Sequence, residues 1–330
     1  MTVAAQVSAE LLEAHRVRLT GYCYRMLGSA ECEDAVQETF IRALRHAERF
    51  DPDRARLSTW LHRIATNVCL DLLRGARRRA LAVDLGPAAT DGELGAPLPP
   101  EVFLEPMPDS RVLADPAEEV GSRQSVRLAF LSALQTLPPR QRAVLILREV
   151  LAFSARETAE IVETSEAAVN SALQRARSTL AARPLTPADV RDESDPAQRD
   201  LLDRYVAAFQ THDVAELVRL LRADAASSMP PFAWWLSGAA QIAAVMTSSD
   251  ACAGDRLVPI AVNGTTGLGQ YRPDDGGVLR PFAILALELR AGQVAHIITF
   301  LGSQERFAEF GLPDDPAVVL SGVRPSARLT

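Results

Sequence analysis

The stretch LPPRQRAVLILREVLAFSARETAEIVETSEAAVNSALQRARSTL, residues 137–180, decides the fold of one part of the chain. Its apolar residues recur at helical spacing, which predicts three helices separated by tight turns. Ser154 lies three residues before Glu157, the spacing of a capping box, so the second helix is expected to begin there. Ser165 would cap the third helix, which runs to about Leu180. Two short helices joined by a tight turn, the second one longer and basic at its end, are typical of a helix-turn-helix.

The third of these helices has two different faces. Val169, Leu173 and Ala176 belong to an apolar stripe that is expected to be buried. The opposite face carries Asn, Gln and Arg, the side chains that form paired hydrogen bonds with base edges. A helical hairpin with a polar surface would show the same periodicity, but the cap, the turn and the outer face together favour DNA reading. The outward-facing residues are Asn170, Ser171, Gln174, Arg175, Arg177 and Ser178.

Residues 8–80 form another helical block. In ECEDAVQETFIRALRHAERF, residues 31–50, an apolar stripe predicts one buried helix face. The polar side chains opposite this stripe fit an ordinary solvated surface or a contact with a partner. The stripe comprises Val36, Phe40, Ile41 and Leu44, and the outward residues include Asp34, Gln37 and Glu38.

The next segment, DPDRARLSTWLHRIATNVCLDLLRGARRR, residues 51–79, predicts a further helix with Ser58 or Thr59 as its N-cap. Trp60, at the helix entry, could stack on a base or anchor the core. Arginines at the helix end could neutralise phosphates. The expected buried stripe is Leu61, Ile64, Ala65, Val68 and Leu72. The expected outward residues are His62, Arg63, Asn67, Asp71 and Arg74, and the cationic end is Arg74, Arg77, Arg78 and Arg79.

Charge is distributed unevenly along the chain. The net charge is −7 and there is no lysine, yet residues 1–80 and 124–183 each carry a net +3. Residues 81–123 carry −7 and residues 184–330 carry −6. This segregation favours DNA contact by the two basic blocks. The Pro, Gly and acidic residues of 81–123 predict an extended, partly ordered linker, and 184–197 predicts a second one.

The length of 330 residues allows two or three domains, each with its own core. No apolar run approaches the roughly 18 residues of a membrane span, and the N-terminus lacks a signal-peptide core. A cytoplasmic protein without a membrane partner is therefore expected. The four cysteines form no C-x-x-C pair, which predicts a reduced compartment, no metal and no cofactor.

Together the two helical blocks resemble a bacterial sigma factor of the extracytoplasmic-function (ECF) type, in the sigma-70 family. The matching stretches are DAVQETFIRAL, STWLHRIATNVCLDLLR and the helix-turn-helix stretch, in matching order, over about residues 10–183. The resemblance implies an all-α sigma region 2 domain at 8–80 and an all-α sigma region 4 domain at 124–183. It also implies an alternative sigma factor that directs core RNA polymerase to specific promoter DNA.

The resemblance assigns roles to particular positions. Asp34, Gln37 and Glu38 would dock on the clamp helices of the polymerase β′ subunit, and the β flap is the other expected polymerase contact. The loop RFDPDRARLS and the next helix would capture a flipped base of the −10 strand. The linker 81–123 would thread toward the polymerase active-site channel. The expected −10 contacts are Trp60, Arg63, Asn67, Asp71, Arg74, Arg77 and Arg78. The expected −35 contacts are Ser165, Asn170, Ser171, Gln174, Arg175 and Arg177.

The chain continues well beyond these blocks. Two amphipathic helices, 198–210 and 213–222, precede short apolar runs that predict strands. The expected hairpin turns are NGTTG, DDGG and RAGQ. Residues 198–320 resemble the SnoaL-like branch of the cone-shaped NTF2-like α+β fold. The expected fold class is therefore multidomain, with two all-α sigma domains followed by an α+β cone.

The segment SSMPPFAWWLSG, residues 227–238, holds two of the three tryptophans. If it is a strand, alternation sends Trp234 and Trp235 to opposite faces, one into the cone and one toward a neighbouring domain. A structural role, a contact with the sigma domains and a ligand-binding role in a pocket all stay open. The residues concerned are Pro231, Phe232, Trp234 and Trp235, with His296 from a later strand.

Two classes of function follow. The leading one is a sigma factor modulated in cis by its acidic C-terminal domain, which could inhibit or brace it, with an anti-sigma protein as an optional partner. The rival is a ligand sensor or small-molecule isomerase or cyclase, with the N-terminal part as a targeting module. The candidate bases are His212, Asp213, Asp224, Asp250 and His296. Because spacing places no second titratable group beside His296, no catalytic residue is expected, although a small ligand stays open.

Overall fold

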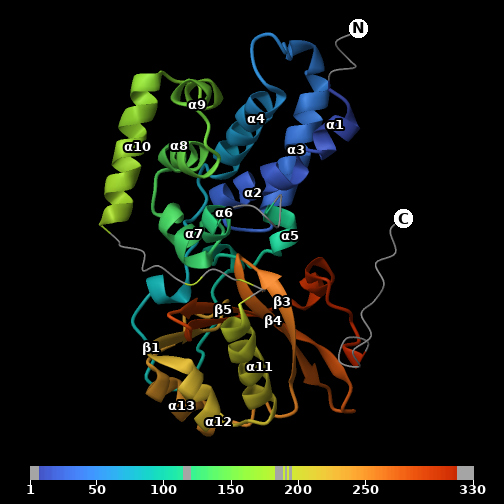
Figure 1. Cartoon of the computed structure of the whole chain (residues 1–330), viewed down its shortest axis with the longest axis vertical. Helices are drawn as coiled ribbons and strands as arrows, with labels where there is room; N and C mark the ends of the chain where they lie inside the picture. Colours follow the sequence, from blue (N-terminus) through green and yellow to red (C-terminus); the bar gives the residue numbers. More distant parts are fainter. Residues whose placement is uncertain (1–6, 114–119, 183–188, 190–191, 193–194, 318–330) are drawn as a thin grey trace. The chain divides into compact units, whose positions relative to one another are not determined.

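The computed structural model describes residues 7–113, 120–182, 189, 192 and 195–317 of the chain (Figure 1). The chain forms two compact units that interleave along the sequence. The helical unit comprises Met1–Ala80 and Asp109–Thr186, and the α+β unit comprises Leu81–Pro108 and Pro187–Thr330. The two predicted sigma domains thus form one unit. The predicted linker 81–123 is divided, since its first part belongs to the α+β unit.

The first part of the helical unit is built from amphipathic helices. Its elements are α1 (Ala9–Glu13), α2 (Arg16–Leu27), α3 (Glu31–Arg45), the 3-10 turn η2 (Ala47–Arg49) and α4 (Leu57–Leu72). The predicted N-cap of α4 is wrong, because the extended residue before the helix is Arg56, and Thr59 is buried within the first turn. Leu44 and Leu72, predicted as core, are 46% and 47% exposed because the helix ends that carry them project beyond the packed part.

The second part of the helical unit contains the predicted helix-turn-helix. Its elements are α5 (Asp109–Val112), α6 (Val120–Ser125), α7 (Leu128–Gln135), α8 (Pro139–Leu145), the π-turn η5 (Ile146–Val150), α9 (Ala155–Ile161) and α10 (Glu166–Ala181). Ser154 and Glu157 form the predicted capping box, and the Ser165 side chain accepts from the Ala168 N–H at 3.2 Å. The stripe of Val169 and Leu173 is buried as expected.

Buried arginines join the two parts of the helical unit. Arg142 of α8 donates to the backbone carbonyl of Met26 and, at 2.6 Å, to the side chain of Gln135. Arg25 of α2 donates to the Ser125 hydroxyl at 2.7 and 3.0 Å. A buried guanidinium is stable only where carbonyl and hydroxyl oxygens surround it, so these bonds fix the relative placement of α2, α6 and α8.

The α+β unit is a mixed six-stranded sheet in the order β2-β1-β6-β5-β4-β3. Strand β1 runs parallel to β6, and all other neighbours are antiparallel. Hairpins close at the three predicted turns between β3, β4, β5 and β6. The elements are α11 (Pro196–Gln210), α12 (Val214–Leu220), β1 (Leu221–Ser228), β2 (Trp235–Ser237), α13 (Ala239–Thr247), β3 (Arg256–Val262), β4 (Thr265–Pro273), β5 (Leu279–Arg290), β6 (Gln293–Leu301) and η6 (Gln304–Phe310).

One face of this sheet is packed against α11, α12 and α13 (Figure 1). Tyr205 of α11, Ile242 of α13 and Leu285 of β5 belong to one buried apolar cluster. The predicted α+β architecture of this part is confirmed, but the sequence missed α13 and read the start of β1 as the end of a helix. The space between sheet and helices holds apolar side chains, including Trp234.

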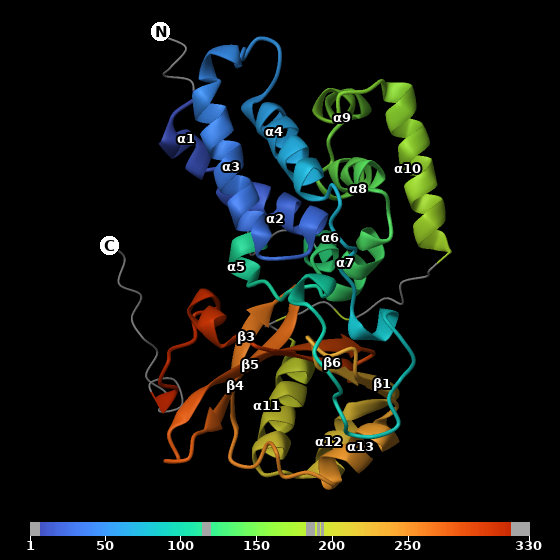
Figure 2. The same ribbon diagram turned by 180° about the vertical axis from the view of Figure 1, so that it is seen from behind.

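Residues 81–108 run along the α+β unit beside β1 and α13 (Figure 2). They include two 3-10 turns, η3 (Ala82–Asp84) and η4 (Pro100–Val102), and end in a bridge between Pro108 and Val262. Asn263 fixes this end, since its side chain accepts from the Met107 N–H and its own N–H donates to the Met107 carbonyl, both at 3.0 Å. The segment is therefore held by backbone hydrogen bonds, unlike an extended linker.

Among the described residues, none of the helices combines the length and apolarity needed to cross a membrane. The same residues contain no cluster of three or more His, Cys, Asp or Glu side chains placed to bind a metal ion.

Candidate nucleic-acid interface

Helix α10 presents an exposed polar face. Asn170, Ser171, Gln174 and Arg175 are all exposed, while Val169, Leu173 and Ala176 are buried against the rest of the helix-turn-helix. A helix anchored in this way can place its outer side chains in a major groove. Two further predicted contacts are engaged, because Arg177 donates to Glu149 at 2.5 Å and Ser165 serves as the N-cap.

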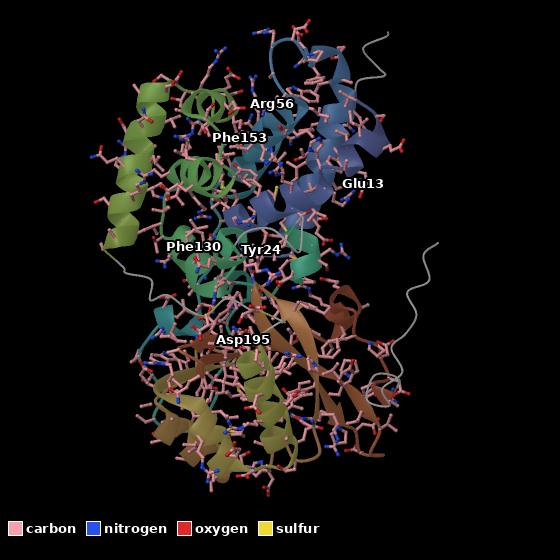
Figure 3. All side chains as sticks on the ribbon, viewed as in Figure 1. Glu13, Tyr24, Arg56, Phe130, Phe153 and Asp195 are labelled. Carbon is pink, nitrogen blue, oxygen red and sulfur yellow. The ribbon has the colours of Figure 1, made fainter. Side chains whose placement is uncertain are left out.

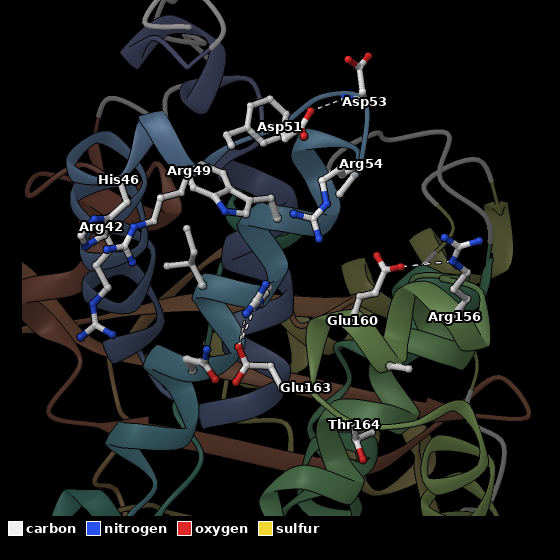
Figure 4. Close-up of a pocket in the computed structure, with 17 residues that line it drawn as sticks. Arg42, His46, Arg49, Asp51, Asp53, Arg54, Arg156, Glu160, Glu163 and Thr164 are labelled. Carbon is white, nitrogen blue, oxygen red and sulfur yellow. Dashed lines mark hydrogen bonds and ion pairs between the residues drawn. The ribbon is translucent and has the colours of Figure 1, made fainter.

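A groove of about 1070 Å³ lies in the helical unit between the loop 46–56, α4 and α9 (Figure 4). Its walls carry five arginines, four carboxylates and two large aromatic rings. The cationic residues are Arg42, Arg49, Arg54, Arg63 and Arg156; the acidic ones are Asp51, Asp53, Glu160 and Glu163; the aromatic ones are Phe50 and Trp60. Aromatic rings beside guanidinium groups are the surface that single-stranded nucleic acids use for stacking and phosphate contact.

Three of the predicted −10 residues line this groove. Trp60, Arg63 and Asn67 come from successive turns of α4. Trp60 is half-buried, and its ring lies 5.3 Å from that of Phe50, so it both anchors the loop and borders the groove. Arg63 is already engaged, since its Nε and Nη2 donate to Glu163 Oε1 at 2.8 and 2.6 Å.

The other predicted −10 residues lie outside the groove lining. Asp71 accepts from Arg74 at 3.1 Å, and Arg77 and Arg78 are exposed beyond the end of α4. Arg79, counted with the same cationic cluster, is 8% exposed and pairs with Glu31 at 3.0 Å. Arg79 therefore holds the end of this segment against α3 and is not part of a basic surface.

His62 was predicted to face outward, and this is wrong. Its ring is 1% exposed and lies between Tyr22, at 5.3 Å, and Phe153, at 5.0 Å. Figure 3 labels Phe153 in the helical unit. Nδ1 donates to the Ser58 carbonyl at 2.7 Å, and Nε2 has no partner among the described residues. Burial lowers the pKa of His62 to about 4, so the ring is neutral near pH 7.

The predicted polymerase-binding residues share one face of α3. Asp34 and Gln37 are exposed, and Glu38 accepts from Arg42 one turn later at 2.6 Å. The exposed side chain of Leu44 follows on the same helix. The acidic face therefore ends in an apolar side chain that a partner could cover.

The double tryptophan lies at the edge strand β2. Trp234 is 8% exposed and belongs to the apolar cluster, while Trp235 is half-buried on the other side of the strand. Both indoles nevertheless reach residues 81–108. The Trp234 Nε1–H donates to the Asp91 carbonyl and the Trp235 Nε1–H to the Gly86 carbonyl, each at 2.9 Å.

The backbone around this segment extends the same contact. The Ala89 N–H donates to the Trp235 carbonyl and the Leu98 N–H to the Pro231 carbonyl, each at 2.8 Å. Gln241 of α13 adds a side-chain bond to the Thr90 carbonyl at 2.6 Å. Phe232 packs on the apolar cluster. The sequence contained no signal for this contact, because main-chain carbonyls accept it.

The candidate bases of the C-terminal domain do not converge. His296 pairs in register with Glu288, so its side chain lies on the sheet face opposite the helices, where Nε2 is 2.9 Å from the Ser228 hydroxyl. Burial lowers the pKa of His296. None of the five candidates belongs to the apolar cluster: Asp213 caps α12, Asp224 pairs with Arg222, and His212 and Asp250 lie in turns.

Comparisons with known proteins match this architecture. Residues 11–79 match the model of Sigma-70 region 2, and residues 127–180 match that of Sigma-70, region 4. The ECF RNA polymerase sigma factor SigG of Mycobacterium tuberculosis is 45% identical over 311 residues, which cover 92% of this chain and 83% of SigG. SigJ of the same organism is 31% identical over 64% of this chain and 61% of its own.

The crystal structure of Mycobacterium tuberculosis SigJ extends the likeness to the fold. It superposes with a TM-score of 0.58 over 92% of this chain and 98% of its own, at 23% identity. Regions 2 and 4 in one chain define a sigma-70-type transcription factor. Within that class, the chain belongs to the family of ECF RNA polymerase sigma factors.

Proposed function

We propose that this sigma factor reads the −35 element of its promoters with the exposed face of α10. The observation that carries the proposal is the row of Asn170, Ser171, Gln174 and Arg175 on a helix whose opposite side is buried. Bidentate donors and acceptors spaced along one helix face match the hydrogen-bonding pattern of base edges in a major groove. The groove beside α4 then takes the −10 strand, and the acidic face of α3 docks on core RNA polymerase.

The test is transcription in vitro with core RNA polymerase and promoters enriched from a random pool. Arg175→Ala is expected to weaken promoter binding by about 5- to 150-fold, which is the effect of removing one arginine that contacts a base edge. Arg280→Ala, an exposed arginine on the β5 hairpin, is the matched control and is expected to keep full activity. Equal activity of the two variants would overturn the assignment of the reading helix.

We also propose that the C-terminal domain modulates the sigma factor through residues 81–108. This segment connects regions 2 and 4, and the resemblance to ECF factors sends it toward the polymerase active-site channel. In the α+β unit the same segment is bound by Trp234, Trp235 and Gln241. These bonds either withhold the segment from the polymerase or hold it in the shape that the polymerase accepts, so they set the activity of the sigma factor.

Point substitutions test this better than removal of the domain, which would leave residues 81–108 without their sheet. Trp235→Phe removes one indole bond, and Gln241→Ala removes the bond to Thr90, while Gln304→Ala removes an exposed side chain of η6 as the control. Higher transcription from both variants identifies the contact as inhibitory, and lower transcription identifies it as a brace. Activity equal to that of Gln304→Ala overturns the proposal.

We propose no catalytic role for the C-terminal domain. The five candidate bases are dispersed among a strand face, a helix cap, a surface ion pair and turns, and an acid–base site requires such groups to converge on one substrate. Incubating the full chain with candidate ligands and measuring its melting temperature tests this view. Stabilisation that His296→Gln abolishes would contradict it.

A further inference from the structure

Within the helical unit, the two predicted DNA-reading domains touch one another. Arg63 of α4, a predicted −10 contact, is bonded twice to Glu163, which lies in the turn between the two helices of the helix-turn-helix. Phe153, just before α9, covers the buried ring of His62 on α4. The groove lies beside these contacts, with Arg156 and Glu160 of α9 as its second wall (Figure 4).

The distance between α4 and α10 in this arrangement is too short for both helices to contact their promoter elements at once. The −10 and −35 elements are separated by about 25 base pairs, which at 3.4 Å per base pair spans roughly 85 Å of duplex. Here α9 contacts α4, and α10 packs on α9. Since packed helices lie about 8–10 Å apart, the axes of α4 and α10 are within roughly 20 Å. One molecule cannot read both elements until α9 leaves α4.

We propose that the Arg63–Glu163 ion pair is a latch that closes the −10 groove, with the Glu163 carboxylate occupying the position that a DNA phosphate takes on Arg63. The inference rests on the proposed reading of the −10 strand by α4. Glu163 suits the role because its left-handed backbone, with φ of +55°, turns the chain where its carboxylate bonds to Arg63 of α4. The carboxylate meets the guanidinium as a phosphate oxygen would.

The latch is weak enough for DNA to open it. The side chains of Arg63 and Glu163 are 52% and 49% exposed, so solvent screens the pair. Exposed ion pairs shift an equilibrium by about 1.4- to 5-fold. A strand that contacts several of the groove arginines gains more than this, because each phosphate contact also releases counterions. Promoter DNA and Glu163 therefore compete for Arg63, and DNA displaces Glu163 when enough of its phosphates contact the groove arginines.

The chain offers a matched pair of variants. Glu163→Gln removes the carboxylate that crosses to α4. Glu160→Gln removes one from the same groove, but its partner is Arg156 on its own helix at 3.4 Å. Both variants lower the negative charge of the groove by the same amount, so a difference between them reports the latch and not the general attraction of DNA.

Two measurements on the full-length protein complete the test. The first is the affinity for a short fluorescein-labelled single-stranded DNA of random sequence. The second is the rate at which diethyl pyrocarbonate modifies His62, which Phe153 shields while the latch is closed. The affinity for DNA and the rate of His62 modification are each expected to be about 1.4- to 5-fold higher for Glu163→Gln than for Glu160→Gln. Equal behaviour of the two variants in both measurements overturns the latch. Faster modification of His62 without any DNA binding supports the latch and refutes the proposed −10 function of the groove.

Discussion

Acidification should destabilise the helical unit through His62. The pKa of His62 is about 4 in the folded chain because the ring is buried between Tyr22 and Phe153, and 6.5 in an unfolded chain. Above pH 6.5 the ring is neutral in both states and contributes nothing to the pH dependence. Between pH 6.5 and 4 the unfolded chain binds a proton that the folded chain excludes, so the free energy of unfolding falls as the pH falls.

The size of the effect follows from the two pKa values. At pH 5 the unfolded state gains a statistical factor of about 30 over the folded state, which is about 2 kcal/mol. Below pH 4 both states bind the proton, and the loss is complete at about 3 kcal/mol. For a unit of this size, 2 kcal/mol corresponds to a melting temperature lower by about 4–8 °C.

The assay is urea unfolding at pH 7.5 and pH 5, followed by circular dichroism, which reports mainly the helices. His62→Gln cannot titrate, so between pH 7.5 and pH 5 its free energy of unfolding is expected to fall by about 2 kcal/mol less than that of the natural chain. The variant is expected to be less stable than the natural chain at both pH values. His46→Gln, at an exposed position of the groove, serves as the control. A natural chain and a His62→Gln variant with the same pH dependence would refute the reasoning.

Two further changes test other parts of the fold. Ser154→Ala removes the side-chain acceptor of the capping box and should lower the free energy of unfolding of the helical unit by about 1 kcal/mol in urea titrations, whereas Ser178→Ala, exposed on α10, should leave it unchanged. Gly267→Ala would place a Cβ 2.3 Å from a valine methyl group and 2.8 Å from the Leu285 carbonyl, so the melting temperature should fall with a loss of about 1–3 kcal/mol; Gly86→Ala, whose Cβ meets open space, is the control, and equal melting would contradict the packing of β4.

The helix-turn-helix was predictable because each of its signals is local. The capping box at Ser154, the cap at Ser165 and the apolar stripe around Leu173 lie within a few residues of one another, and propensity, capping and burial favour the same helices. The three hairpin turns of the sheet were predictable for the same reason. Helical periodicity was less informative at helix ends, since Leu44 and Leu72 continue an apolar stripe beyond the part of the helix that is covered.

The contacts that define the site were not predictable, because they join residues far apart in sequence through groups with little sequence signal. Arg63 is an exposed charge on an ordinary helix and Glu163 an exposed charge in a turn, and nothing in their spacing indicates that they meet. The indoles of Trp234 and Trp235 bind carbonyls, which every residue carries. His62 lies at a helical position that periodicity assigned to the surface, and it is buried because Tyr22 and Phe153 cover its ring.

The interleaving of the two units has a consequence for synthesis on the ribosome. The helical unit is complete once the chain reaches Thr186, whereas the partners of residues 81–108 lie in a unit whose sheet is complete only when β6 ends at Leu301. The intervening segment of about 115 residues takes roughly 6–23 s to translate at about 5–20 residues per second. During that interval each nascent chain carries complete sigma regions joined by residues 81–108, which the α+β unit does not yet bind. A newly made molecule therefore passes through a state that the finished protein regains only by opening the contacts at Trp234 and Trp235.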